Sequence, residues 1–298
     1  MPVILSVEDL IKSYGGREVL HGVSFEVEKG EIFALLGING AGKTTTLECI
    51  EGLKRYDSGE IRFHQDFENR KKQFEFMGIQ LQSTALPGNI TVLEAYRLFC
   101  LANKVKADRE LLERFGLKEL YHKQYAFLST GQKRRLHLVL ALVHNPDIVI
   151  LDEPTAGLDV EGQVALHEEI FHLKSAGKTV LLASHDMAEV EKLCDRIAII
   201  KDGKVGFTGS PEELISASKD MTEIALKTAE TIMVPELSCS KYVKRENGYD
   251  YYHSETISEA LLELLQTYKD NRYPVLDIKI KHSTLEEKFM EFSREELV

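Results

Sequence analysis

The sequence contains no long apolar run. The longest, Leu138–Val143, is far shorter than the roughly 18–20 residues that a membrane-spanning helix needs. The N-terminal residues also lack the basic region and the small-residue cleavage site of a secretory signal. We therefore expect a soluble, intracellular protein.

Cysteine and positive charge are also in short supply. The four cysteines are far apart and form no Cys-x-x-Cys pair, so neither a zinc site nor a disulfide framework is predicted: Cys49, Cys100, Cys194 and Cys239. Lysine and arginine together number 37 against 48 acidic residues, which gives a net charge of −11. Nucleic-acid-binding proteins usually present a basic face, so nucleic acid is not an expected partner.

The 298 residues, 43% of them hydrophobic, are enough for one large domain or two unequal ones. Continuous apolar runs are typical of strands buried on both faces of a parallel sheet, and four occur, at Ile32–Leu36, Asp147–Leu151, Val180–Ala183 and Ile197–Ile200. Val19–Val27 and Ile61–His64 resemble strands of a partly exposed antiparallel flank instead. The pattern over residues 83–145 is helical. There Thr91 and Glu94 form a capping box for a helix expected to bury Leu93, Tyr96 and Leu101.

The pattern changes after Gly209-Ser210-Pro211, which divides the chain into residues 1–210 and 211–298. Asn247-Gly248 predicts a hairpin turn, and Val275–Ile280 a strand. Thr256 with Glu259 is expected to cap an amphipathic helix that carries Ile257, Ala260, Leu261, Leu264, Leu265 and Tyr268 on one face. Ser283 with Glu286 is expected to cap a last helix bearing Leu285, Phe289 and Phe292. The second part is therefore predicted to be a small α+β module.

Residues 37–44 fit the pattern Gly-x-x-x-x-Gly-Lys-[Ser/Thr] between a predicted strand and a predicted helix: Gly37, Ile38, Asn39, Gly40, Ala41, Gly42, Lys43 and Thr44. Glycines let several backbone N–H groups face one anion, and the helix N-terminus adds its partial positive charge. Lys43 can reach the β- and γ-phosphates of a nucleotide, and the Thr44 hydroxyl can ligate Mg²⁺. This segment predicts a phosphate-binding loop.

Two acidic residues, Asp152 and Glu153, directly follow the apolar run at Ile148–Leu151. Asp152 is placed to bind Mg²⁺ or its hydration shell, as the acidic partner of a phosphate loop does. Glu153 would then face the γ-phosphate and could polarise a water molecule.

Leu128-Ser129-Thr130-Gly131-Gln132 resembles the LSGGQ signature of ATP-binding cassette (ABC) ATPases, and further elements occur in the order of that family. Tyr14 is at the position of the aromatic residue that stacks on adenine. Gln82 is at the Q-loop position, with Gln80 as a less favoured candidate. Residues 156–159, ending in Asp159, resemble the D-loop, and residues 184–186, centred on His185, the switch-histidine loop.

The resemblance, which covers about residues 3–210, implies an α/β phosphate-loop NTPase sheet with an antiparallel β flank and a helical subdomain. It implies an ATPase that binds ATP and Mg²⁺, with Thr44, Gln82 and Asp152 toward the metal and Glu153, His185 and Gln82 in catalysis. Two chains, identical or different, would form a head-to-tail dimer. In it each ATP lies between one chain's loop, with Thr44 and Thr45, and the other chain's Ser129, Gly131, Gln132 and Asp159.

The resemblance further implies that the chain couples ATP hydrolysis to a separate membrane-spanning permease from the inner face of the membrane. Residues 283–289 are similar to the end of ATPase subunits of drug, antibiotic-peptide and polysaccharide exporters, which favours export over import. A soluble ABC ATPase of translation or DNA repair is a second reading, disfavoured by the single cassette and by the short interval between Lys43 and Ser129. A non-hydrolysing binding module is a third, opposed by Glu153 and His185. Residues 211–298 are either a structural appendage or a dimerisation or regulatory module.

Overall fold

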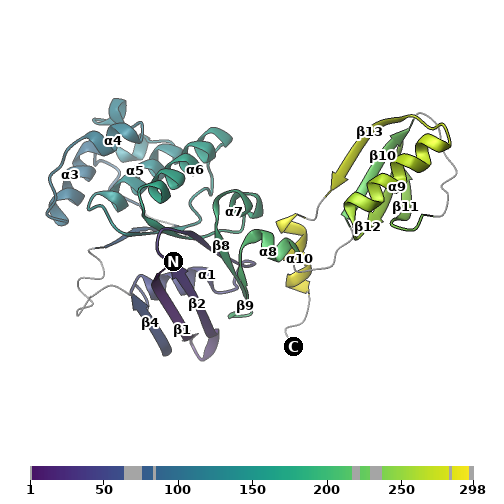
Figure 1. The fold of residues 1–298 in the computed structure, drawn as a ribbon. Helices are drawn as coiled ribbons and strands as arrows, with labels where there is room; N and C mark the ends of the chain where they lie inside the picture. The colour runs from purple at the N-terminus through teal and green to yellow at the C-terminus, as the bar shows by residue number, and fades with distance from the viewer. Residues whose placement is uncertain are drawn as a thin grey trace. The chain divides into compact units, whose positions relative to one another are not determined.

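The computed structural model describes residues 2–63, 76–82, 85–216, 222–228, 237–281 and 284–294. Two compact units form, Met1–Pro211 and Glu212–Glu295 (Figure 1). In the part of the chain that the structure describes, no helix has the length and apolar character needed to cross a membrane.

The first unit is built on a sheet with the strand order β5-β6-β7-β3-β8-β9. Its strands are β3 (Ile32–Leu36), β5 (Met77–Gln80), β6 (Ile148–Asp152), β7 (Thr179–Ala183), β8 (Arg196–Lys201) and β9 (Lys204–Gly209). All neighbours are parallel except β8 and β9, which are antiparallel. Every residue of β3, β6 and β7 is buried, because these strands are the continuous apolar runs of the sequence. The prediction of a buried parallel sheet is confirmed.

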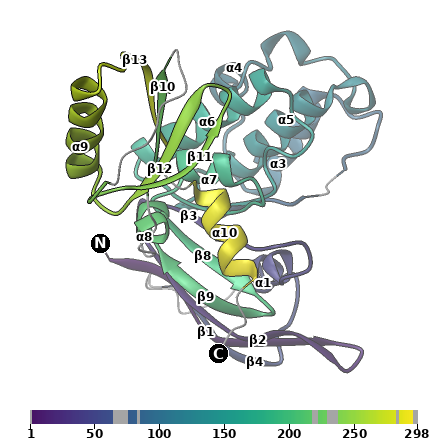
Figure 2. The same cartoon turned by 90° about the vertical axis from the view of Figure 1, so that its right-hand side faces the viewer.

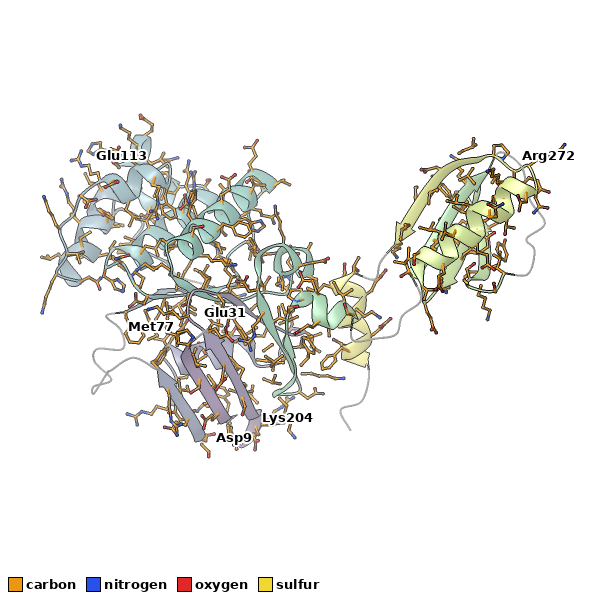
Figure 3. The ribbon with its side chains drawn as sticks, viewed as in Figure 1. Asp9, Glu31, Met77, Glu113, Lys204 and Arg272 are labelled. Atoms are coloured by element: carbon orange, nitrogen blue, oxygen red, sulfur yellow. The ribbon has the colours of Figure 1, made fainter. Side chains whose placement is uncertain are left out.

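A second sheet, in the order β2-β1-β4, forms the antiparallel flank. It consists of β1 (Val3–Tyr14), β2 (Arg17–Glu28) and β4 (Ser58–Phe63), while His64 of the predicted strand lies outside the described residues. Side chains fill the space between the flank and the central sheet, and Met77, labelled in Figure 3, belongs to this core. Phe25 of β2 stacks on Phe33 of β3 with ring centroids 5.5 Å apart.

The helices of the first unit are α1 (Lys43–Ile50), α3 (Val92–Ala102), α4 (Glu110–Arg114), α5 (Thr130–Leu142), α6 (Val160–Ser175) and α7 (Met187–Leu193), with 3₁₀ turns at Lys118–Leu120 and Tyr125–Phe127. Figure 1 shows α3, α4, α5 and α6 on the side of the central sheet opposite the β1-β2-β4 flank.

The predicted capping box of α3 is confirmed, because Thr91 Oγ1 accepts from Glu94 N at 3.3 Å and Glu94 Oε2 accepts from Thr91 N at 2.9 Å. Leu93 and Tyr96 are buried as expected, but Leu101 is 76% exposed, so its predicted place in the core was wrong. Cys100 is buried instead, since residues 93, 96 and 100 share one stripe of a 3.6-residue helix and residue 101 lies outside it.

Helix α8 (Pro211–Ser216) starts at Pro211, the residue before the second unit, and the second unit contains an antiparallel sheet in the order β11-β12-β10-β13. Its strands are β10 (Thr222–Thr228), β11 (Lys241–Glu246), β12 (Tyr249–Ser254) and β13 (Val275–Lys281). The β11–β12 turn at Asn247 (φ 50°) and Gly248 (φ 81°) is the predicted hairpin turn, since two successive residues with positive φ suit a type I′ turn. Figure 2 shows α9 (Ile257–Asp270) on one face of this sheet.

The core of the second unit lies between α9 and the sheet. Ala260, Leu264 and Tyr268 of α9 are buried with Ile224, Leu226 and Tyr252 of the sheet, whereas Leu265, predicted for the same face, is 39% exposed. Buried polar groups are paired within this core: Tyr268 OH donates to Asp250 Oδ2 at 3.2 Å, and Arg245 Nη1 donates to the same oxygen at 2.9 Å.

The helix caps of the second unit differ in detail from the prediction. Thr256 precedes α9, but its hydroxyl donates to the Glu259 carboxylate at 3.1 Å and does not bond a backbone N–H of the helix. The last helix, α10, spans Leu285–Arg294. The predicted cap Ser283 lies outside the described residues, and Thr284 and Glu287 form a reciprocal pair at this end, each side chain accepting from the other's backbone N–H at 3.2 Å.

Candidate functional site

The site lies at the carboxyl edge of the central sheet. Strand register places Leu35, Ala183 and Asp152 in one row across β3, β7 and β6. Parallel strands end at the same edge, so the residues that follow this row lie together there. From these three residues the chain continues into the phosphate loop, Glu153 and the Ser184–His185 segment, which therefore lie together at this edge.

The phosphate loop needs two of its glycines for steric reasons. A Cβ on Gly37 would lie 2.5 Å from the carbonyl oxygen of Ile200, so no other residue fits without moving the backbone. Gly42, the residue before α1, has φ 112°, where side chains are strained, and a Cβ there would approach Leu20 Cδ2 to 2.6 Å. The loop therefore curls tightly and leads directly into the N-terminus of α1.

Lys43 is buried beneath the loop, with 6% of its surface exposed. Its Nζ donates to the carbonyl oxygen of Gly37 at 2.7 Å and more weakly to that of Ile38 at 3.4 Å. Burial lowers the pKa of Lys43, and the charges of Glu153 and Asp152 oppose this effect. The ammonium is thus held at the sheet edge, in the field of both carboxylates.

Asp152 is the last residue of β6 and is buried. Burial raises its pKa, while a hydrogen bond with the Thr44 side chain lowers it. Its Oδ1 has no hydrogen-bond partner among the described residues. A buried, unpartnered carboxylate oxygen beside a hydroxyl is a donor set suited to a hard cation.

Glu153 has a left-handed backbone, with φ 48°, which is uncommon for residues other than glycine and costs energy. Its N–H donates to the Ala183 carbonyl at 3.0 Å, and its Oε2 lies 2.6 Å from His185 Nδ1. The Glu153 side chain is 8% exposed and that of His185 60%. The pair therefore joins a buried carboxylate to an imidazole that faces outward.

The two candidate glutamines differ in exposure. Gln80 is the last residue of β5 and is buried, and neither atom of its amide has a partner among the described residues. Gln82 lies beyond the strand end and is exposed. Of the two glutamines, Gln82 is therefore the one whose side chain is open to solvent.

Ser129 caps α5 with a second capping box: its Oγ accepts from Gln132 N at 3.3 Å, and Gln132 Oε1 accepts from Ser129 N at 3.1 Å. Ideal Cβ positions on Gly131 and Gly157 would lie 3.6 Å from Leu158 Cδ2 and 3.5 Å from Thr130 Cγ2. The signature thus packs beside the residues preceding Asp159, and no hydrogen bond among the described residues joins it to the phosphate loop of the same chain.

Asp159 and Tyr14 lie at the ends of their elements. Asp159 caps α6, accepting from Gly162 N at 2.9 Å, and is exposed. Tyr14 ends β1 and is 42% exposed, with Lys12 Nζ 5.1 Å from the centre of its ring. Asp57 fixes this strand end, because it accepts from Ser13 N at 2.6 Å.

Two polar residues near the site, Thr155 and Glu189, were not singled out from the sequence, and Ser184 entered only as part of the segment resembling the switch-histidine loop. Both hydroxyls donate to Glu189 Oε2, Ser184 at 2.7 Å and Thr155 at 3.1 Å. The carboxylate therefore connects the segment after Glu153 to the residue before His185. Nothing in the sequence marks these three residues as partners.

Comparison with known proteins gives the family. A family model for ABC transporters matches residues 20–156. An uncharacterised ABC transporter ATP-binding protein of Methanocaldococcus jannaschii is 33% identical over 96% of this chain and 98% of its own length. The linearmycin resistance ATP-binding protein LnrL of Bacillus subtilis is 38% identical over 72% of this chain and 71% of its own.

Solved structures agree with these relatives. The ATP-binding subunit of an ABC transporter superposes with a TM-score of 0.66 at 30% identity and covers 72% of this chain and 92% of its own. The chain belongs to the ATP-binding proteins of ABC transporters. It is an ATPase subunit that binds and hydrolyses ATP for transport.

Proposed function

We propose that this ATPase energises an exporter, and that it does so as a head-to-tail dimer, homo- or heteromeric, bound to separate membrane-spanning permease chains. The observation that carries the hydrolytic mechanism is the 2.6 Å contact between Glu153 Oε2 and His185 Nδ1, beside buried Lys43. A carboxylate held by an imidazole at a phosphate-binding edge is suited to activating a water molecule.

A Mg²⁺ ion is assigned to Thr44 and Asp152, with Gln82 as a further ligand. The unpartnered Oδ1 of Asp152 and the neighbouring Thr44 hydroxyl support this assignment, because Mg²⁺ takes oxygen ligands together with substrate phosphates. When bound, the ion neutralises charge on the β- and γ-phosphates.

The chain's own groups would supply the rest of the catalysis. Backbone N–H groups of residues 37–45 and the N-terminus of α1 hold the phosphates, and Lys43 stabilises charge on the transferring phosphoryl group. Glu153 takes a proton from the attacking water, while His185 orients Glu153 and contacts the γ-phosphate. Tyr14, exposed at the end of β1, stacks on the adenine.

The dimer completes the site. The N-terminus of α5 at Ser129 can receive a second anion contact, yet within one chain the signature packs beside Leu158 and is not bonded to the phosphate loop. A partner chain would bring its Ser129, Gly131 and Gln132 to the γ-phosphate. Asp159, exposed at the start of α6, would then lie at the interface between the two chains.

We assign the nucleotide chemistry to residues 1–210 and treat residues 211–298 as a separate domain. Every residue assigned to ATP or Mg²⁺ precedes Gly209 in the sequence. The apolar cluster around Tyr252 and Tyr268 consists only of residues from the second part of the chain, which supports a module with its own core.

The permease is assigned to the helical subdomain. Large apolar side chains are exposed there, namely Leu98, Leu101 and Phe127. The 3₁₀ turn that ends at Phe127 runs beside the segment after Gln82, since Ala126 N donates to the Gly88 carbonyl at 2.9 Å. A permease bound here would lie close to Gln82, the further Mg²⁺ ligand proposed above. The chain would then be attached to the inner face of the membrane.

Export is favoured by two relatives whose names state their roles. One is the linearmycin resistance protein of Bacillus subtilis, and the other is the Nod factor export ATP-binding protein I of Ralstonia nicotianae, 37% identical over 72% of this chain and 69% of its own. Both names fit a chain that drives substrate out of the cell.

We expect Leu101→Arg to weaken association with the permease while ATP hydrolysis by the isolated chain stays near the parental rate. The substitution places a charge on an exposed apolar site of the helical subdomain, at a residue that is not assigned to ATP. Leu262→Arg on α9, where the leucine is 72% exposed, is the matched control. Co-purification from membranes that contain the permease is the measurement. Equal recovery of the two variants would count against this docking surface.

A further inference from the structure

The loops that carry Glu153 and His185 are tied together by one buried carboxylate. Glu189 lies on α7 and is 3% exposed. Its Oε2 accepts from the Ser184 hydroxyl at 2.7 Å and from the Thr155 hydroxyl at 3.1 Å. Thr155 comes two residues after Glu153, and Ser184 directly before His185.

The same cluster fixes the backbone around His185. Ser184 Oγ accepts from Asp186 N at 3.1 Å, and Asp186 Oδ1 accepts from Glu189 N at 3.1 Å. The residues on both sides of His185 are thus hydrogen-bonded into one ring that closes on Glu189. Among the described residues, the side chain of His185 is hydrogen-bonded to Glu153 alone.

The backbone of Glu153 is strained, so its conformation depends on the hydrogen bonds around it. Its positive φ is a conformation that persists only where the surroundings enforce it. The enforcing contacts are the Glu153 N–H bond to the Ala183 carbonyl before the turn and the Thr155–Glu189 bond after it. We infer that Glu189 is a positioning residue for ATP hydrolysis. Through Thr155 and Ser184 it holds Glu153 and His185 at hydrogen-bonding distance from each other.

This inference rests on the roles proposed for Glu153 and His185 and adds a residue that contacts neither reacting atoms nor nucleotide. It requires an oxygen acceptor at the position of Oε2, and not a negative charge. Burial raises the pKa of Glu189, and the hydrogen bonds from Ser184 and Thr155 oppose this. The other oxygen, Oε1, lies 3.5 Å from His167 Nε2, where an amide nitrogen could equally be placed.

The test compares Glu189→Leu with Glu189→Gln in the full chain. Leucine keeps the volume and removes the acceptor, so kcat should fall about 10- to 100-fold, the loss expected when a catalytic group shifts by about 1 Å. ATP affinity should stay near the parental value, because the phosphate loop is untouched. Glutamine keeps an acceptor oxygen for both hydroxyls and should recover most of the rate. Glu191→Leu, on the exposed side of the same helix, is the matched control.

A merely structural role would lower thermal stability without changing kcat well below the unfolding temperature. Parental kcat in a folded Glu189→Leu variant, or a Glu189→Gln variant as slow as Glu189→Leu, would overturn the inference. If Glu189→Leu does not fold, Ser184→Ala and Thr155→Val each remove one donor with little loss of volume. Each should reduce kcat with ATP binding retained, and parental kcat in both would overturn it.

Measuring Glu153→Gln in parallel separates a failure of the proposed catalytic base from a failure of the positioning role. Normal turnover in Glu153→Gln would refute the proposed catalytic base, whatever Glu189 does. If Glu153→Gln is inactive and Glu189→Leu is normal, only the positioning role fails. The double variant should be no slower than Glu153→Gln alone, because residues that act through one group show non-additive effects.

Discussion

Glu153→Gln is expected to bind ATP normally and to hydrolyse it about 10²- to 10⁴-fold more slowly, the usual cost of losing a general base. The amide nearly preserves the shape of the side chain but cannot take a proton from water. It can still accept a hydrogen bond from His185, whose Nδ1 lies 2.6 Å from Glu153 Oε2, so the loop should keep its conformation.

Steady-state ATP hydrolysis and nucleotide binding should be measured on the same preparation. Glu161→Gln, an exposed acid in the first turn of α6, controls for the loss of one negative charge. Because bound ATP persists in the slow variant, the dimer should accumulate in the presence of Mg²⁺ and ATP. Turnover near the parental rate would remove Glu153 from its assigned role.

Lys43→Ala is expected to abolish detectable hydrolysis and to weaken ATP binding about 10- to 100-fold. A hydrogen bond to a charged group contributes about 1.5–3 kcal/mol, and each 1.4 kcal/mol corresponds to about a tenfold change in affinity. The variant also leaves the carbonyl of Gly37 without its 2.7 Å donor, so its thermal unfolding must be recorded as well.

Titration with ATP is the measurement for Lys43→Ala. Lys54→Ala, an exposed lysine shortly after α1, removes the same charge away from the loop and should bind ATP like the parent. A Lys43→Ala variant that is folded, binds ATP with parental affinity and hydrolyses it would show that the loop does not hold the phosphates as described.

The fold of the first unit could largely be predicted from the sequence because its strands are short and apolar throughout. The runs at Ile32–Leu36 and Val180–Ala183 are short and apolar throughout, as is typical of strands in a sheet covered on both faces. Side-chain placement on α3 is less predictable: the hydrophobicity of Leu101 favours its burial, while the geometry of the helix buries Cys100. On this helix, the position of a residue around the helix axis determines its burial more than its hydrophobicity does.

The candidate site was predictable where one short segment carries several constraints. Gly37–Thr44 combines glycines, a lysine and a hydroxyl at fixed spacing, and Gly37, Gly42, Lys43 and Thr44 each have a steric or electrostatic reason. The Glu189 cluster was not predictable, because Thr155, Ser184 and Glu189 are common residue types that only the fold brings together. The contact of Glu153 with His185 likewise depends on β6 and β7 ending side by side.

The claim that two chains share each ATP is tested most directly by mixing two inactive variants. Lys43→Ala removes the phosphate-loop side of each site, and Ser129→Arg puts a long, bulky side chain at the exposed N-terminus of α5. In a head-to-tail dimer of one variant chain with the other, one site carries both lesions and the second site carries neither. We predict that each variant alone is inactive and that ATP hydrolysis returns when they are mixed. Light scattering with Mg²⁺ and ATP should confirm that the mixed chains pair with each other, and a paired mixture as inactive as its components would contradict the head-to-tail arrangement.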